Sequence, residues 1–178
     1  MTAGLSIKAR ALRCLAQREH SRAELERKLS AALARVRAGR PGVGASGPGG
    51  AEEHEGRDED PSTRELQQVR QALDELTERG LLSDARAAES VLAAQGRRHG
   101  SRRVKQVLQA KGLAAELVEA TLQQSRATEY ARAREVWLRR FGAPADDAAG
   151  RARQARFLAG RGFDGEIIRR LVKGLDAD

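Results

Sequence analysis

The chain has 178 residues, 33% of them charged and only 3% aromatic, so its core has to be built from leucine, alanine, valine and isoleucine. Abundant Ala, Leu, Arg and Glu with few aromatic or β-branched residues favour helix over strand and predict an all-α protein. The net charge of +8 favours a polyanionic partner. No window of the sequence approaches the ~20 apolar residues of a membrane span. The single cysteine, Cys14, excludes an intrachain disulfide.

Two helices are expected before residue 36. Apolar residues recur at helical spacing from Leu5 to Leu15. Ser21 and Glu24 then form a capping-box pattern at the start of a second helix. Residues 36–61 follow, rich in Gly, Pro and Ser and then in acids, and we expect a disordered insertion there. This glycine-rich stretch lacks the Gly-Lys-Ser/Thr of a phosphate loop.

Seven further helices are predicted after the insertion, which makes nine in all. Each is expected to begin at a capping Ser, Thr or Asp and most to end at a Gly. Ser62, Ser101 and Thr128 (or Ser125) are the expected caps of three of them. The predicted ranges are 62–79, 83–95, 101–111, 113–122, 128–141, 145–160 and 164–173.

One phrase occurs twice, 50 residues apart: LQAKGLAAELVEATL at 108–122 and LAGRGFDGEIIRRLV at 158–172. Each copy has a basic residue and a glycine, then a large apolar residue, and then a glutamate three positions on. We interpret the phrase as a helix–turn–helix corner, with Gly112 and Gly162 at positive φ and the glutamate in the first turn of the next helix.

The corners indicate a repeat of three helices, because a longer helix precedes each of them. A first copy becomes visible when the insertion is removed. The sequence therefore predicts three tandem three-helix repeats in an elongated, curved array. Their expected ranges are 1–79 with the insertion at 36–61, 80–124 and 125–178.

Two segments resemble a known family. GLLSDARAAESVLAAQGRRHGSRRVKQVLQAKGL at 80–113 and ALRCLAQREHSRAELERKL at 11–29 resemble the central and first modules of the RecX family, bacterial regulators of the RecA recombinase. The resemblance covers about 1–33 and 62–174. The sequence departs from the family pattern at Ala87, where an aromatic residue is usual, and at Val107, where a glutamate is common.

The resemblance implies an all-helical regulator of recombination, DNA repair and the SOS response. Such a protein binds RecA, lies in the groove of the RecA–DNA filament beside single-stranded DNA, and restrains ATP hydrolysis and strand exchange. It does no chemistry and needs no cofactor, and we expect a soluble, cytoplasmic monomer. A stand-alone DNA-binding protein and a helical scaffold without a nucleic-acid role are the alternatives.

Basic side chains of the second and third repeats are the candidate contacts with the filament or with DNA. Arg102 and Lys105 are expected on the helix face opposite Val104 and Leu108. The competing interpretation is an ordinary solvated helix surface. The candidates are Arg97, Arg98, Arg102, Arg103, Lys105, Lys111, Arg132, Arg139, Arg140, Arg151, Arg153 and Arg156, with Arg161 as an extension.

No catalytic or metal-binding pattern was found. None of His20, His54 and His99 has a second ligand at zinc spacing, and Cys14 has no partner cysteine. Trp137 and Tyr130 match the apolar period and are expected in the core.

Overall fold

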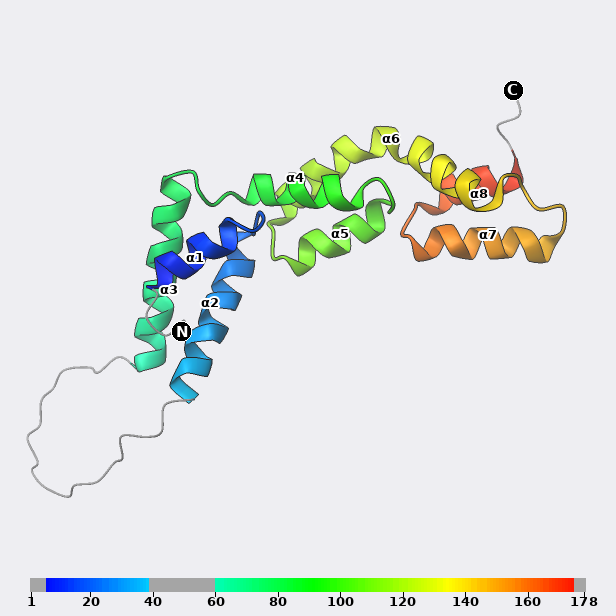
Figure 1. Cartoon of the computed structure of the whole chain (residues 1–178). Coiled ribbons are helices and arrows are strands. Elements are labelled where there is room, and N and C mark those ends of the chain that lie inside the picture. The colour runs from blue at the N-terminus through cyan, green and yellow to red at the C-terminus, as the bar shows by residue number, and fades with distance from the viewer. Residues whose placement is uncertain (1–5, 39–59, 175–178) are drawn as a thin grey trace, which may run out of the picture. The chain divides into compact units, whose positions relative to one another are not determined.

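The computed structural model describes residues 6–38 and 60–174, and these residues form eight α-helices and no strand (Figure 1). The predicted all-α class is therefore confirmed. The chain divides into two compact units, Met1–Ser83 and Asp84–Asp178.

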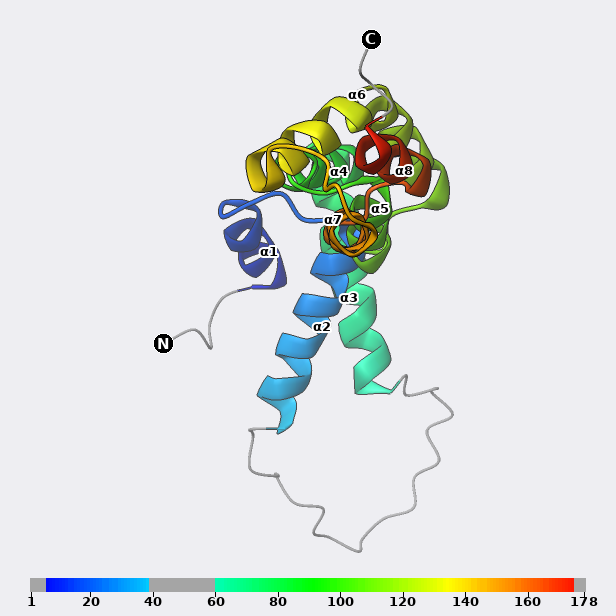
Figure 2. The same ribbon diagram turned by 90° about the vertical axis from the view of Figure 1, so that its right-hand side faces the viewer.

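The first unit holds α1 (Ile7–Leu15), α2 (Arg22–Ala38) and α3 (Pro61–Glu78). Figures 1 and 2 show α2 and α3 side by side, with α1 packed near one end of the pair. The predicted apolar stripes face one another here, because burying them removes apolar surface from water. The buried core consists of Ala11, Leu25, Leu29, Val69, Leu73, Leu76 and Leu82.

Helix ends in this unit confirm one prediction and correct another. The amide of Glu24 donates to Ser21 Oγ at 3.2 Å, as the capping box predicts. The expected cap at Ser62 is wrong, because Asp60 caps α3 and Pro61 takes the first helical position. Since α2 runs to Ala38, both ends of the predicted 36–61 insertion belong to helices, and the residues between them lie outside the described ranges.

The second unit holds α4 (Asp84–Gln95), α5 (Ser101–Ala110), α6 (Ala115–Phe141), α7 (Ala148–Gly160) and α8 (Gly165–Lys173). Helices α4 and α5 pack against the first part of α6, and α7 and α8 pack against its last part (Figure 1). Two separate cores result. The first contains Ala88, Val91, Val104, Leu108, Leu113, Val118 and Leu122; the second contains Ala133, Trp137, Leu158, Phe163, Ile168, Leu171 and Val172.

A single 27-residue helix, α6, replaces the two helices predicted at 113–122 and 128–141. The prediction of nine helices is wrong for this reason. No Gly or Pro interrupts the chain between Leu122 and Thr128, so nothing breaks the helix. The expected cap Thr128 lies inside α6, and its hydroxyl donates to the carbonyl of Ser125 at 3.3 Å.

Both repeated corners have the predicted geometry. Gly112 and Gly162 have φ of +74° and +78°, a region that only glycine occupies freely. The apolar residues that follow them, Leu113 and Phe163, are buried. The expected cap at Ser101 is wrong, however: Gly100 is the N-cap of α5 and offers no side chain.

Candidate functional site

The N-terminus of α5 lies directly on the turn that ends α7. The amide of Gly100 donates to the carbonyl of Arg161 at 3.0 Å, and the amide of Arg102 donates to that of Gly162 at 3.1 Å. A Cβ on Gly100 would come within 2.3 Å of the Gly162 carbonyl oxygen, and one on Gly162 within 2.5 Å of the Arg103 nitrogen. Two glycines therefore permit this backbone contact, which we call the α5–α7 joint.

Two charged side chains of α6 form hydrogen bonds with the backbone next to the joint. Glu129 is 2% exposed, and its Oε1 accepts from the amide of Ser101 at 3.0 Å and from its hydroxyl at 3.2 Å. This carboxylate accepts the hydrogen bond of an amide in the first turn of α5, which a capping side chain would otherwise accept.

Arg132 holds the turn between α4 and α5 from the same helix. Its Nη1 donates to the carbonyls of Gly96 and, at 3.1 Å, His99, and its Nη2 donates to the carbonyl of Ser125 at 2.9 Å. Burial lowers the pKa of this guanidinium, and the nearby Glu129 carboxylate opposes that shift. Arg132 thus ties α6 to a turn more than 30 residues earlier.

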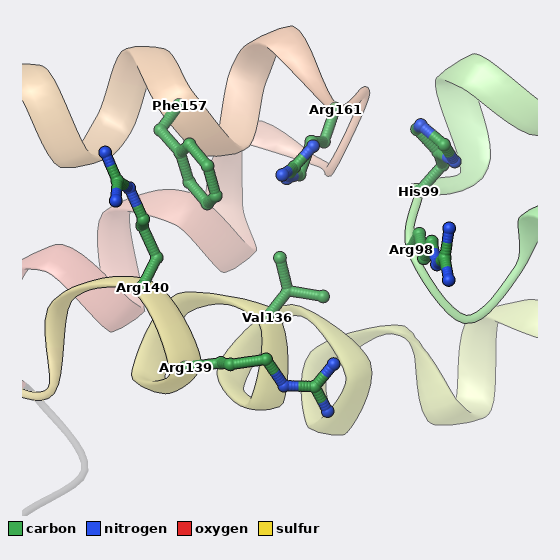
Figure 3. A pocket seen from close by; sticks show the side chains of 7 residues that line it. All are labelled: Arg98, His99, Val136, Arg139, Arg140, Phe157 and Arg161. Carbon is green, nitrogen blue, oxygen red and sulfur yellow. The ribbon is translucent and has the colours of Figure 1, made fainter.

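A pocket of about 530 Å³ opens beside the joint. Three elements supply its walls: the turn after α4, helix α6, and α7 with the turn that ends it (Figure 3). The lining residues are Arg98, His99, Val136, Arg139, Arg140, Phe157 and Arg161. We call this the α6–α7 pocket.

The lining of the α6–α7 pocket is cationic, with four arginines, one histidine and no acidic residue. Arg139 is the arginine with a counter-ion, since its Nη2 lies 2.5 Å from Glu135 Oε1. Among the described residues, Arg98, Arg140 and Arg161 have no carboxylate within ion-pair distance. Such a cluster of like charges favours an anion.

The apolar part of the pocket is made by two side chains that point toward each other. Val136 comes from α6 and Phe157 from α7 (Figure 3). Phe157 makes an edge contact with Phe141 at a centroid distance of 5.1 Å, and the Arg161 guanidinium lies 4.3 Å from the Phe157 centroid. The aromatic ring is therefore fixed in place and carries a cation beside it.

Three of the sequence-predicted candidates, Arg98, Arg139 and Arg140, meet in this pocket, together with Arg161, the predicted extension of the set. Arg97 and Arg132 line a second, smaller pocket of about 250 Å³ with residues of α4 and α6. The inward hydrogen bonds of Arg132 give it a structural role, so we leave it out of the proposed contact surface.

The remaining candidates are spread over α5 and α7. Arg102 and Arg103 are exposed, and Arg102 Nη2 lies 4.0 Å from Asp164 Oδ2. Lys105 pairs with Glu119. Arg151 donates to the carbonyls of Ala145 at 3.1 Å and Asp146 at 2.7 Å. Lys111 is half-buried, whereas Arg153 and Arg156 are exposed.

Sequence reasoning missed three residues of the pocket: His99, Val136 and Phe157. His99 follows the predicted Arg97–Arg98 pair, and Val136 precedes Arg139 by one helical turn. In the sequence alone, Phe157 cannot be distinguished from a residue of the hydrophobic core. Only packing brings the three together, because the turn after α4, α6 and α7 are distant along the chain.

Within residues 6–38 and 60–174, no group of three or more His, Cys, Asp or Glu side chains is placed to hold a metal ion. Over the same residues, no helix is long and apolar enough to span a membrane.

Comparison with known proteins identifies relatives over almost the whole chain. Family models for the second and third three-helix domains of RecX match residues 83–122 and 127–172. "Regulatory protein RecX" of Leptothrix cholodnii is 40% identical over 97% of this chain and 90% of its own length. The protein of the same name from Ralstonia nicotianae is 37% identical over the same shares.

A solved structure has the same fold. The crystal structure of RecX from Lactobacillus salivarius superimposes with a TM-score of 0.66, covers 97% of this chain and 96% of its own, and is 17% identical in sequence.

Proposed function

We propose that this chain, which belongs to the RecX family, regulates the RecA recombinase by binding the RecA–DNA filament and restraining its ATP hydrolysis and strand exchange. The observation that carries the proposal is the family membership, which extends over 97% of the chain. The relatives are named regulatory proteins, and we infer that this chain too acts by binding and not by catalysis.

The charge distribution of the second unit supports a polyanionic partner. Arg98, Arg140 and Arg161 lack ion-pair partners among the described residues, and the side chains of Arg102 and Arg103 are exposed at the joint itself. A nucleoprotein filament offers phosphates, and each arginine can bind a phosphate through two parallel hydrogen bonds. We therefore propose the α6–α7 pocket and the exposed start of α5 as the filament-contacting surface.

The direct test is single-stranded-DNA-dependent ATP hydrolysis by the cognate RecA, measured with and without this protein. Inhibition at stoichiometric amounts is expected, and its absence would refute the proposed function. The variant Arg98→Glu/Arg102→Glu/Arg103→Glu should inhibit much less, because charge reversal replaces attraction to phosphate by repulsion.

The matched control is Arg134→Glu, which is compared with Arg98→Glu alone so that both variants reverse one charge. Arg134 is exposed on α6 and does not line the pocket, so this variant should inhibit like the unchanged protein. Equal loss in both variants would show that total charge, and not this surface, determines inhibition.

A stand-alone DNA-binding protein is the second candidate, because the cationic pocket is formed by this chain alone. Binding to duplex DNA of varied sequence, measured across salt without RecA, separates the two. A clear sequence preference would favour this candidate.

A further inference from the structure

We propose that the α6–α7 pocket binds one nucleotide unit of a DNA single strand, with the phosphate on its arginines and the sugar and base along Val136 and Phe157. The inference deepens the proposed function and rests on it for the origin of the strand, which is the RecA–DNA filament. The site itself is testable without RecA.

The charges of the pocket fit a phosphate. Arg98 and Arg140 stand on opposite sides of the opening, and Arg161 lies between Phe157 and the turn that carries His99 (Figure 3). Arg161 Nε is buried without a hydrogen-bond partner in the structure, so this side chain has a donor that its own protein leaves unused. An anion that draws the guanidinium away from the ring would supply the missing acceptor.

The size and the apolar walls of the pocket favour more than a bare anion. Its volume of about 530 Å³ lies within the ~300–1,000 Å³ of small-ligand sites and far exceeds the needs of one phosphate. Val136 and Phe157 add apolar and aromatic surface next to the arginines. Nucleotides combine these two chemistries, and single-strand-binding proteins pair basic grooves with aromatic side chains for this reason.

The pocket is also held open by contacts that do not involve its ligand-facing groups. Arg132 fixes the carbonyls of Gly96 and His99, and the α5–α7 joint fixes the backbone of Arg161. The side chains of Arg98 and Arg161 therefore extend from two turns whose backbones are anchored. A site built in this way loses less conformational freedom when it binds a ligand.

The experiment measures binding of fluorescein-labelled oligo(dT) to the full chain by anisotropy, without RecA. Arg98→Ala and Arg140→Ala should each weaken binding about threefold at ~0.1 M salt, and the double variant about tenfold. For the double variant, the slope of log affinity against log salt should become shallower by about 0.7, since the pocket holds one phosphate of the single strand. Arg134→Ala removes the same charge from α6 outside the pocket and should leave the affinity unchanged.

Competitors identify the chemistry of the ligand. Free dTMP should compete with oligo(dT), but weakly, because the strand makes further contacts outside the pocket. A strand of abasic sites, which keeps the phosphates and lacks the bases, should bind less tightly than oligo(dT). Equal binding of the abasic strand, or competition by polyglutamate as strong as that by unlabelled oligo(dT) of the same charge, would overturn the assignment of a nucleotide and point to a bare anion or an acidic peptide.

Failure of this inference is distinct from failure of the proposed function. If Arg98→Ala/Arg140→Ala binds oligo(dT) like the unchanged protein and still inhibits RecA, the pocket assignment is wrong and the regulatory function stands. If the double variant loses oligo(dT) binding while the unchanged protein fails to inhibit RecA, the pocket stands and the proposed function is wrong. Thermal melting of each variant confirms that the fold is intact, as expected for exposed side chains.

Discussion

The two units of the chain tie their helices together in different ways. In the first unit the polar links between helices include partly exposed ion pairs: Lys8–Glu75, with 2.5 Å between Nζ and Oε2, Arg22–Asp74 at 2.7 Å and Arg70–Glu26 at 2.9 Å. The second unit also has such an ion pair, Lys105–Glu119, but it adds backbone hydrogen bonds at the α5–α7 joint and the inward-facing Glu129 and Arg132.

This difference predicts which substitutions lower the stability of each unit. Exposed ion pairs contribute little to stability, because water screens them and ordering two long side chains costs entropy. A charged group withdrawn from water needs every one of its partners, and removing one of them exposes the full cost of burying the others. Substitutions at the ion pairs of the first unit should therefore be tolerated, whereas substitutions of Glu129 or Arg132 in the second unit should be damaging.

Arg132→Met should have the largest effect. The methionine keeps most of the aliphatic volume but leaves the carbonyls of Gly96 and His99 without the guanidinium donor, so we expect a loss of about 3 kcal/mol in the free energy of unfolding. Urea denaturation followed by circular dichroism measures it. Lys8→Met, which breaks the Lys8–Glu75 pair of the first unit, is the control and should barely move the midpoint. Similar shifts for both would remove the distinction between the units.

Replacement of a positive-φ glycine should have the next largest effect on stability, and one such glycine from each unit is compared. Gly80→Ala meets no atom within 4 Å, so only the left-handed backbone opposes it, at about 1 kcal/mol. Gly162→Ala adds a collision with the backbone of Arg103 and should cost about 2 kcal/mol or more. Comparing their urea midpoints tests whether the joint is as close as described; equal destabilisation would argue against it.

The exposed ion pairs should behave alike in both units. A hydrogen bond from Lys8 lowers the pKa of Glu75, and one from Lys105 lowers the pKa of Glu119. Because each pKa is lower in the folded state, the stabilisation is present above the ordinary glutamate pKa and is lost as the pH falls through the lowered value. Carboxyl NMR titration of Lys8→Met and Lys105→Met should show each pKa rising to the ordinary range of about 4.3. No rise would mean that the pair does not form in solution.

Removal of residues 39–59 should have the smallest effect. Arg37 Nη1 donates to Ser62 Oγ at 2.7 Å, so the facing ends of α2 and α3 are close enough for a short Gly/Ser linker. Loop length changes stability only slowly, by about 0.6 kcal/mol for each doubling. We expect the melting temperature to stay the same or to rise slightly. A drop of several degrees would show that the removed segment packs against the folded protein.

The helix ends illustrate how far local sequence reasoning reaches. Gly112 and Gly162 were predicted to end helices at positive φ, and both do. Serine and threonine were poorer guides: Ser101 and Thr128 were expected to cap helices, but the first donates to Glu129 and the second lies within α6. A hydroxyl can cap a helix or bond within one, and the surrounding packing decides between these uses.

The sequence by itself determined the all-helical class, the repeated corners and the apolar stripes, because helix propensity, glycine at positive φ and the 3.6-residue period act between neighbours in the chain. Only the tertiary structure decided that the Arg161–Gly162 turn receives the start of α5, and that Arg98, Arg140 and Arg161 surround one pocket. These residues are separated by tens of positions, and no local pattern records which of many exposed arginines packing will bring together. The second copy of the glycine corner is thus both a helix end, which its own sequence specifies, and the contact site of α5, which the packing specifies.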